Sequence, residues 1–102
     1  MDLSTFLKSI EDSQIPPDLN ARLYALWLDG AGKWEKAHSQ INESSDTESA
    51  WIHAYLHRKE GDLWNADYWY SKANRKRPNI DLREEWEDLV THFLKSQNQN
   101  SI

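Results

Sequence analysis

The chain has 102 residues and a mass of 12.0 kDa, which fits one small domain and leaves no room for a second. Its net charge of -5 argues against general binding to nucleic acids, because neutralising phosphates needs a basic face. The absence of cysteine excludes disulfides, thiolate metal sites and thiol nucleophiles. Apolar runs are far shorter than the ~20 residues of a membrane span, and the first residues lack the pattern of a secretory signal. We therefore expect a cytoplasmic protein that does not bind membranes.

The spacing of apolar residues is helical nearly throughout, so the sequence predicts an all-α fold with about six helices and no strand. Several residues mark the helix ends. Pro16 and Pro17 stop the first helix, Ser45 and Glu48 have the spacing of a capping box before the fourth, and Pro78 stops the fifth. In chain order, the expected helices are 2–13, 17 or 18 to about 29, 33–42, 46–60, 63–77 and 81–97, followed by a frayed tail at 98–102.

The sequence contains a weak internal repeat with a period of 29 residues. A shift by this length superimposes two alanine pairs and one glycine pair: Ala25 on Ala54, Gly32 on Gly61 and Ala37 on Ala66. A small residue allows two helices to approach closely, and glycine permits the tight turn between them. The repeat therefore predicts two helical hairpins built on one plan, as in a helical solenoid.

The second repeat resembles a tetratricopeptide repeat. Gly61-Asp62-Leu63 resembles the turn of that family, and the small, aromatic and proline positions of its pattern are occupied by Ala54, Ala66, Tyr70, Ala73 and Pro78. The sequence departs from the pattern at Trp51, one place late, and at His53 and His57, which replace the usual Leu and Tyr. The stretch from His53 to Asp62 is also similar to a group of small bacterial proteins with no assigned activity.

This resemblance implies one domain over 1–102 with four parts and a tail: an N-terminal capping helix (2–13), a degenerate repeat (19–45), a tetratricopeptide-like repeat (46–79), a C-terminal capping helix (80–97) and the tail (98–102). It also implies a non-enzymatic protein-interaction module that binds a protein or peptide in a concave groove. The groove residues carried over from the family are Trp51, Tyr55, Arg58 and Lys59, with Arg22 and Asp29 at the other end. An Arg and a Lys beside two aromatic side chains suit a peptide with acidic and apolar residues. The competing interpretation is that the helix 2–13 covers this groove.

Two histidines suggest an alternative function as a small metal-binding protein. His53 and His57 share one helix face at i, i+4, Glu60 follows three residues later, and His38 on the preceding helix can join them. The motif lacks the glutamate of a zinc protease, because Ala54 stands at that position. The alternative without a metal ion is that one histidine packs as a neutral aromatic ring, hydrogen-bonded to Tyr68, Tyr70 or Asp67, while the other faces solvent.

Aromatic and basic residues also have structural explanations. The tryptophans can form a ligand platform, but they fall mainly on inward stripes, at Trp27, Trp34, Trp64 or Trp69, and Trp86. The basic cluster Lys72, Arg75, Lys76 and Arg77 matches the negative end of the predicted fifth helix. We therefore expect no nucleic-acid partner, no cofactor and no catalytic residue, in a chain that is a monomer or a homodimer.

Overall fold

The computed structural model describes the backbone of residues 1–99 and the side chains of residues 1–98. The regular secondary structure of these residues consists of helices without a strand, which confirms the predicted all-α class. None of its helices has the length and apolar character required to cross a membrane. The six helices are α1 (Leu3–Glu11), α2 (Ala21–Gly30), α3 (Trp34–Ile41), α4 (Thr47–Glu60), α5 (Leu63–Lys72) and α6 (Leu82–Gln99).

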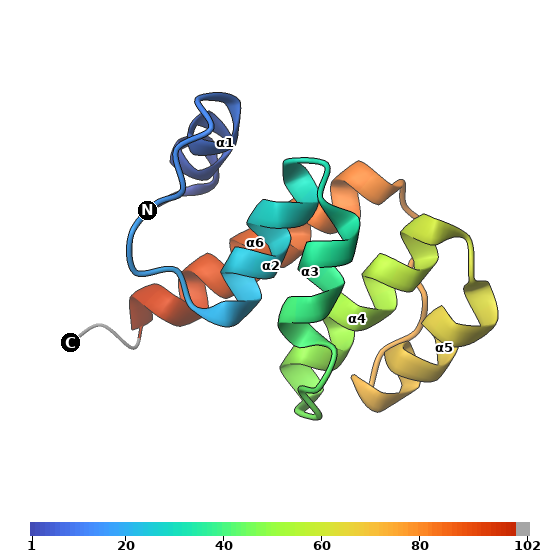
Figure 1. Ribbon diagram of the computed structural model, residues 1–102. Coiled ribbons are helices and arrows are strands. Elements are labelled where there is room, and N and C mark those ends of the chain that lie inside the picture. The colour runs from blue at the N-terminus through green and yellow to red at the C-terminus, as the bar shows by residue number, and fades with distance from the viewer. Residues whose placement is uncertain (100–102) are drawn as a thin grey trace.

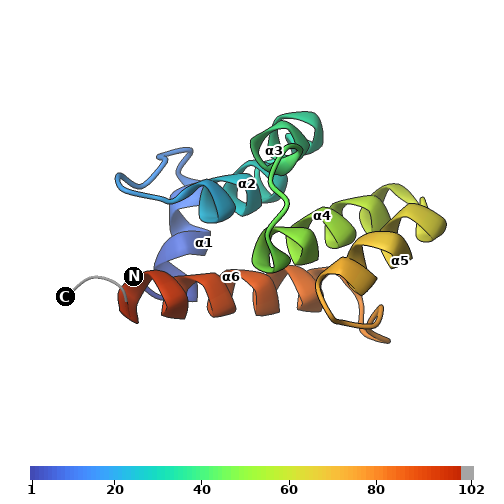
Figure 2. The same ribbon diagram turned by 90° about the horizontal axis from the view of Figure 1, so that it is seen from below.

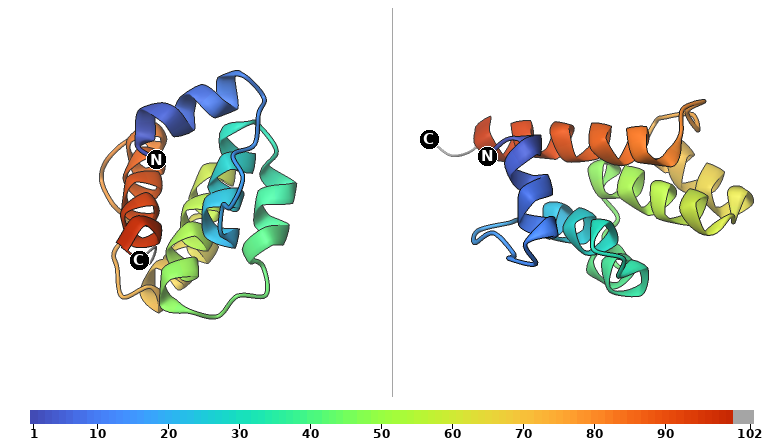
Figure 3. Two further views of the ribbon diagram at one scale, coloured as in Figure 1. Left: turned by 90° about the vertical axis from the view of Figure 1, so that its left-hand side faces the viewer. Right: turned by 90° about the horizontal axis from the view of Figure 1, so that it is seen from above.

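The helices form two antiparallel hairpins and a long helix that packs across them (Figure 1). The first hairpin is α2 with α3, and the second is α4 with α5. Figure 2 shows α6 running along one side of the molecule, where it contacts α1, α2 and α4. In both views of Figure 3, α1 bridges the ends of α2 and α6. The long C-terminal helix therefore covers both hairpins.

Side-chain caps fix the starts of α1, α2, α4 and α5. Asp46 caps α4 by accepting a hydrogen bond from the backbone N–H of Ser49 at 2.9 Å, so the predicted cap at Ser45 is one residue early. The second helix begins at Ala21 and not at Pro17 or Asp18, because Asp18 has a left-handed backbone with φ of 66°.

The C-terminal ends of two predicted helices also differ. α5 ends at Lys72, since Asn74 is left-handed and the N–H of Arg75 bonds the carbonyl of Tyr70 at 2.9 Å. The basic residues 75–77 therefore lie in a loop beyond α5 and not in its last turn. α6 continues to Gln99, so residues 98 and 99 of the expected frayed tail are helical, and 100–102 lie outside the described residues.

The core joins α1, α2, α4 and α6. Phe6, Leu26, Ile52 and Leu89 are fully buried, one from each of these helices. The Trp86 side chain on α6 packs against Phe6, and its indole N–H donates to the carbonyl of Leu26 at 3.0 Å. Because α6 supplies a continuous buried stripe to all three neighbours, it is an integral layer of the core.

Candidate metal centre

The expected peptide groove is filled by α6. Trp51 and Tyr55 on α4 and Asp29 on α2 are 8%, 2% and 2% exposed, so little of the expected binding surface is accessible. The Tyr55 hydroxyl donates to the Asp29 carboxylate at 3.0 Å, and the Trp51 indole donates to Glu85 of α6 at 3.2 Å. The expectation of an open groove is therefore corrected, and the helix that covers it is α6, not the helix 2–13.

The three cations predicted for that groove form ion pairs within the molecule. Arg58 forms an ion pair with the buried Glu85 at 2.9 Å and also donates to the carbonyl of Ile80. Lys59 pairs with Asp29 at 2.9 Å, and Arg22 pairs with Asp46 at 2.9 Å. These cations stabilise the packing of α2, α4 and α6.

Sequence reasoning did not identify Glu85, which is the centre of the buried polar network. Its carboxylate is 1% exposed and accepts hydrogen bonds from Tyr70 at 2.7 Å, from Trp51 and from Arg58. The available signal was its position, since Glu85 falls three residues after Leu82 on the apolar stripe of α6.

Three histidines meet where α3 packs on α4. His38 comes from α3, while His53 and His57 lie one turn apart on α4. Their ring nitrogens lie within 4.8 Å of one another, and the Nε2 atoms of His38 and His53 are 3.1 Å apart. His53 and His57 are 3% and 7% exposed, whereas His38 is half-buried. The i, i+4 spacing sets the pair on α4, and the hairpin packing adds the third ring.

Two tryptophan side chains stack against the histidine cluster. The indole of Trp34 lies parallel to His38 at 5.1 Å between centroids, and that of Trp69 lies parallel to His53 at 3.9 Å. Trp69 is thus the inward-facing tryptophan of α5, and Trp64 is 81% exposed. Trp34 precedes His38 by four residues, a spacing visible in the sequence, whereas the sequence left open whether Trp64 or Trp69 faces inward.

The environment keeps two of these rings neutral at neutral pH. Burial, together with the neighbouring rings of His38 and His57, lowers the pKa of His53 to about 4. Burial and the nearby His57 also lower the pKa of His38 below its usual value. Each neutral imidazole has one nitrogen that carries a lone pair, which is the form that binds metal ions. In this structure the Nε2 atoms of His38 and His53 hydrogen-bond to each other, so one ring donates and the other accepts.

A carboxylate orients the third ring. The Nδ1 atom of His57 lies 2.6 Å from Oε1 of Glu60, which leaves Nε2 as the nitrogen of this ring that Glu60 does not engage. Metal-bound histidines in proteins almost always donate their second N–H to a carboxylate, a carbonyl or water. Glu60 therefore stands as an outer partner of His57, in addition to forming a more exposed group with His57 and Asp62.

The hydrogen bonding of the cluster is incomplete within the described residues. The Nδ1 atom of His53 is buried, and among these residues it has no hydrogen-bond partner. Such atoms are rare in folded proteins, and this one is the other ring nitrogen from the Nε2 atom that faces His38. The alternative expectation was that one α4 histidine bonds Tyr68, Tyr70 or Asp67 while the other faces solvent. It is wrong, because both histidines are buried and hydrogen-bond to His38 and Glu60 instead.

Comparisons of this chain with protein-family models, curated proteins and solved structures found no match. The chemistry of the site is therefore argued from its geometry alone.

Proposed function

We propose that this protein binds a divalent transition-metal ion, with Zn²⁺ as the first candidate, through His38, His53 and His57. The observation that carries the proposal is the convergence of three ring nitrogens from two helices within 4.8 Å, in a mostly buried site. Nitrogen ligands about 2.0–2.1 Å from a tetrahedral Zn²⁺ lie about 3.3 Å from one another. The 3.1 Å separation between the Nε2 atoms of His38 and His53 is close to that spacing.

The ligand type decides the class of ion. Imidazole nitrogen suits Zn²⁺, Cu²⁺, Ni²⁺ and Fe²⁺, whereas Mg²⁺ and Ca²⁺ prefer carboxylate, carbonyl and water oxygens. Three protein ligands leave one position of a tetrahedral ion for water or an external ligand. The proposal is limited to binding of the ion and assigns no reaction.

The protonation states favour binding near neutral pH. A metal ion competes with a proton for each imidazole, and a histidine with a lowered pKa presents its lone pair without first losing a proton. His53 and His38 are both in this condition. Glu60 holds the ring of His57, which reduces the rotamer freedom lost when the ion binds.

The test is metal binding by the untagged full chain. Isothermal titration with Zn²⁺ and the visible absorption of added Co²⁺ should both show one ion per chain at pH 7.5. His38→Gln should weaken binding by at least about tenfold, since it removes one of three ligands. His38 is half-buried and needs little repacking, so circular dichroism should show the helical content of the wild type.

The fourth histidine supplies a matched control. His92 lies on α6 and pairs with Glu48 at 2.7 Å, and it does not belong to the three-histidine cluster. His92→Gln should bind Zn²⁺ as the wild type does. Binding far below one ion per chain, or equal losses in His38→Gln and His92→Gln, would show that the cluster is not a metal centre.

We also propose that the two hairpins are tetratricopeptide-like units. Each is an antiparallel helix pair, and the left-handed glycines Gly32 and Gly61 stand at the two turns, with φ of 81° and 90°. The interaction function implied by that resemblance would require α6 to leave α4 and expose Trp51 and Tyr55. We therefore base the function on the histidines.

A further inference from the structure

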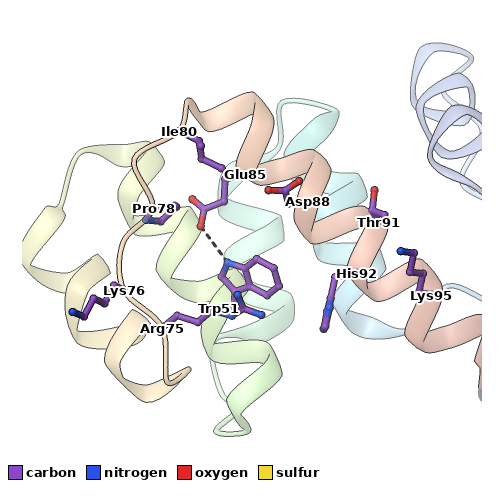
Figure 4. A pocket seen from close by; sticks show the side chains of 10 residues that line it. All are labelled: Trp51, Arg75, Lys76, Pro78, Ile80, Glu85, Asp88, Thr91, His92 and Lys95. Atoms are coloured by element: carbon purple, nitrogen blue, oxygen red, sulfur yellow. Dashed lines mark hydrogen bonds between the residues drawn. The ribbon is translucent and has the colours of Figure 1, made fainter.

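A second candidate binding site shares no residue with the cluster of His38, His53 and His57. A cavity of about 430 Å³ opens between α4, α6 and the loop after α5 (Figure 4). Trp51 lines it from α4, Pro78 and Ile80 line the loop side, and His92 and Lys95 line the side of α6. This volume falls in the range of about 300–1,000 Å³ that small-molecule sites occupy.

Arg75 is held in position at this cavity. Its guanidinium carbon lies 3.5 Å above the centroid of the Trp51 ring, and the indole is fixed in turn by its hydrogen bond to Glu85. The loop is fixed as well, because the N–H of Arg75 bonds Tyr70 and the carbonyl of Ile80 accepts from Arg58. Among the residues that the structure describes, no acceptor or carboxylate pairs with the guanidinium of Arg75.

The charge around the cavity is positive although the chain as a whole is negative. Lys76 and Lys95 also line it, and neither forms an ion pair with any side chain of residues 1–98. Of the two carboxylates present, Glu85 already pairs with Arg58, which leaves only Asp88 to oppose three cations. Figure 4 shows Arg75 and Lys95 on either side of the Trp51 and His92 rings, with Lys76 farther out on the loop.

We propose that this cavity binds a small organic molecule through a carboxylate or phosphate group placed on Arg75. A guanidinium stacked on an aromatic ring presents its N–H groups edgewise, in a planar fork that matches the two oxygens of such a group. Lys95 and Lys76 add charge around the same anion. The apolar surface of Pro78 and Ile80 accommodates the rest of the molecule. This site is independent of the proposed metal centre and uses none of its residues.

The experiment is a nuclear magnetic resonance titration of the ¹⁵N-labelled full chain. Inorganic phosphate and succinate are added in separate arms, with sodium chloride at matched ionic strength as the reference. Saturable shifts are expected at the Trp51 indole N–H and at the amides of residues 75–80, with a Kd of about 1 mM or below. The anion that binds more tightly, phosphate or succinate, identifies the preferred anionic group. Chloride should produce no saturable shift at these positions.

Two variants separate recognition from general charge. Arg75→Lys keeps the charge but removes the planar fork, and it should weaken binding by about tenfold or more. Lys33→Ala removes an exposed cation on the distant α3 hairpin and should leave the Kd unchanged. Both residues are exposed, so the remaining amide spectrum should stay that of the folded wild type.

Three results would overturn the proposal. The first is the absence of saturable shifts with both anions, and the second is equal weakening in Arg75→Lys and Lys33→Ala. The third is tighter binding of a single-stranded oligonucleotide at Arg75 than of either small anion, which would assign the cations to nucleic acid. None of these results depends on whether the histidine cluster binds metal.

Discussion

Acidification should destabilise the metal-free protein through His53. The folded state holds the pKa of this ring at about 4, against an ordinary value of 6.5. Between these two pH values the unfolded chain binds a proton that the folded chain does not bind, so stability falls as pH is lowered and levels off below pH 4. The full shift corresponds to about 3 kcal/mol.

Most of this loss occurs in an accessible pH range. Between pH 7 and 4.5, two-state proton linkage gives a loss of about 2 kcal/mol from His53, out of the ~5–15 kcal/mol that stabilise a typical domain. His38 adds to the loss in the same direction, because its pKa is also lowered. The carboxylate of Asp46 adds nothing in this range: although burial acts to raise its pKa, hydrogen bonds from Ser49 and Arg22 hold it at about 2.

The assay is urea unfolding, followed by tryptophan fluorescence, at several pH values in the presence of a chelator. His53→Phe removes the titrating group and preserves an aromatic ring against Trp69. Its free energy of unfolding should fall by about 2 kcal/mol less than that of the wild type between pH 7 and 4.5. The reasoning is refuted if the two proteins lose stability in parallel, or if the His53 ring titrates near pH 6.5 in a proton NMR experiment.

Three further substitutions test the packing, each measured as the change in free energy of urea unfolding. Glu85→Ala should cost about 3–5 kcal/mol, because it leaves the charge of Arg58 without its buried partner. Gly30→Ala should cost about 1–3 kcal/mol, because the added Cβ would lie 2.7 Å from Cζ2 of Trp86. Asp46→Ala should cost about 1 kcal/mol, because it removes the N-cap of α4.

Matched controls make these outcomes specific. Glu84→Ala changes an exposed neighbour of Glu85 and should alter stability by less than about 0.5 kcal/mol. Ser45→Ala should be equally mild, since Asp46 and not Ser45 caps the helix. A neutral Gly30→Ala would mean that α1 and α6 are not packed against the end of α2 as described.

Local rules account for what the sequence predicted correctly. Helical spacing identified six helices, glycine marked the turn at Gly61, and the i, i+4 spacing set His53 and His57 on one face. These features depend on backbone geometry over one or two turns, which the order of residues determines directly.

The predicted start of α2 and the predicted end of α5 were wrong for a local reason that the residue types alone do not reveal. The backbone is left-handed at Asp18 and Asn74, two residues that adopt this conformation more readily than most but do not require it. Aspartate and asparagine can also take part in a helical turn. The sequence therefore did not determine where α2 starts and α5 ends, and the backbone conformation in the structure did.

Which surface covers α4 was decided by the tertiary structure. Every residue from Ser49 to His57 is buried, so α4 is enclosed on all sides and has no solvent face to show which neighbour lies where. The sequence by itself determined the helices and the histidine pair, because both follow from spacing along one backbone. The burial of Trp51 under α6, the packing of His38 beside His53 and the hydrogen bonds of Glu85 join residues that are 15 to 42 positions apart in the chain. Such contacts are selected by how the whole chain buries its apolar surface, and no repeat along a single helix encodes them.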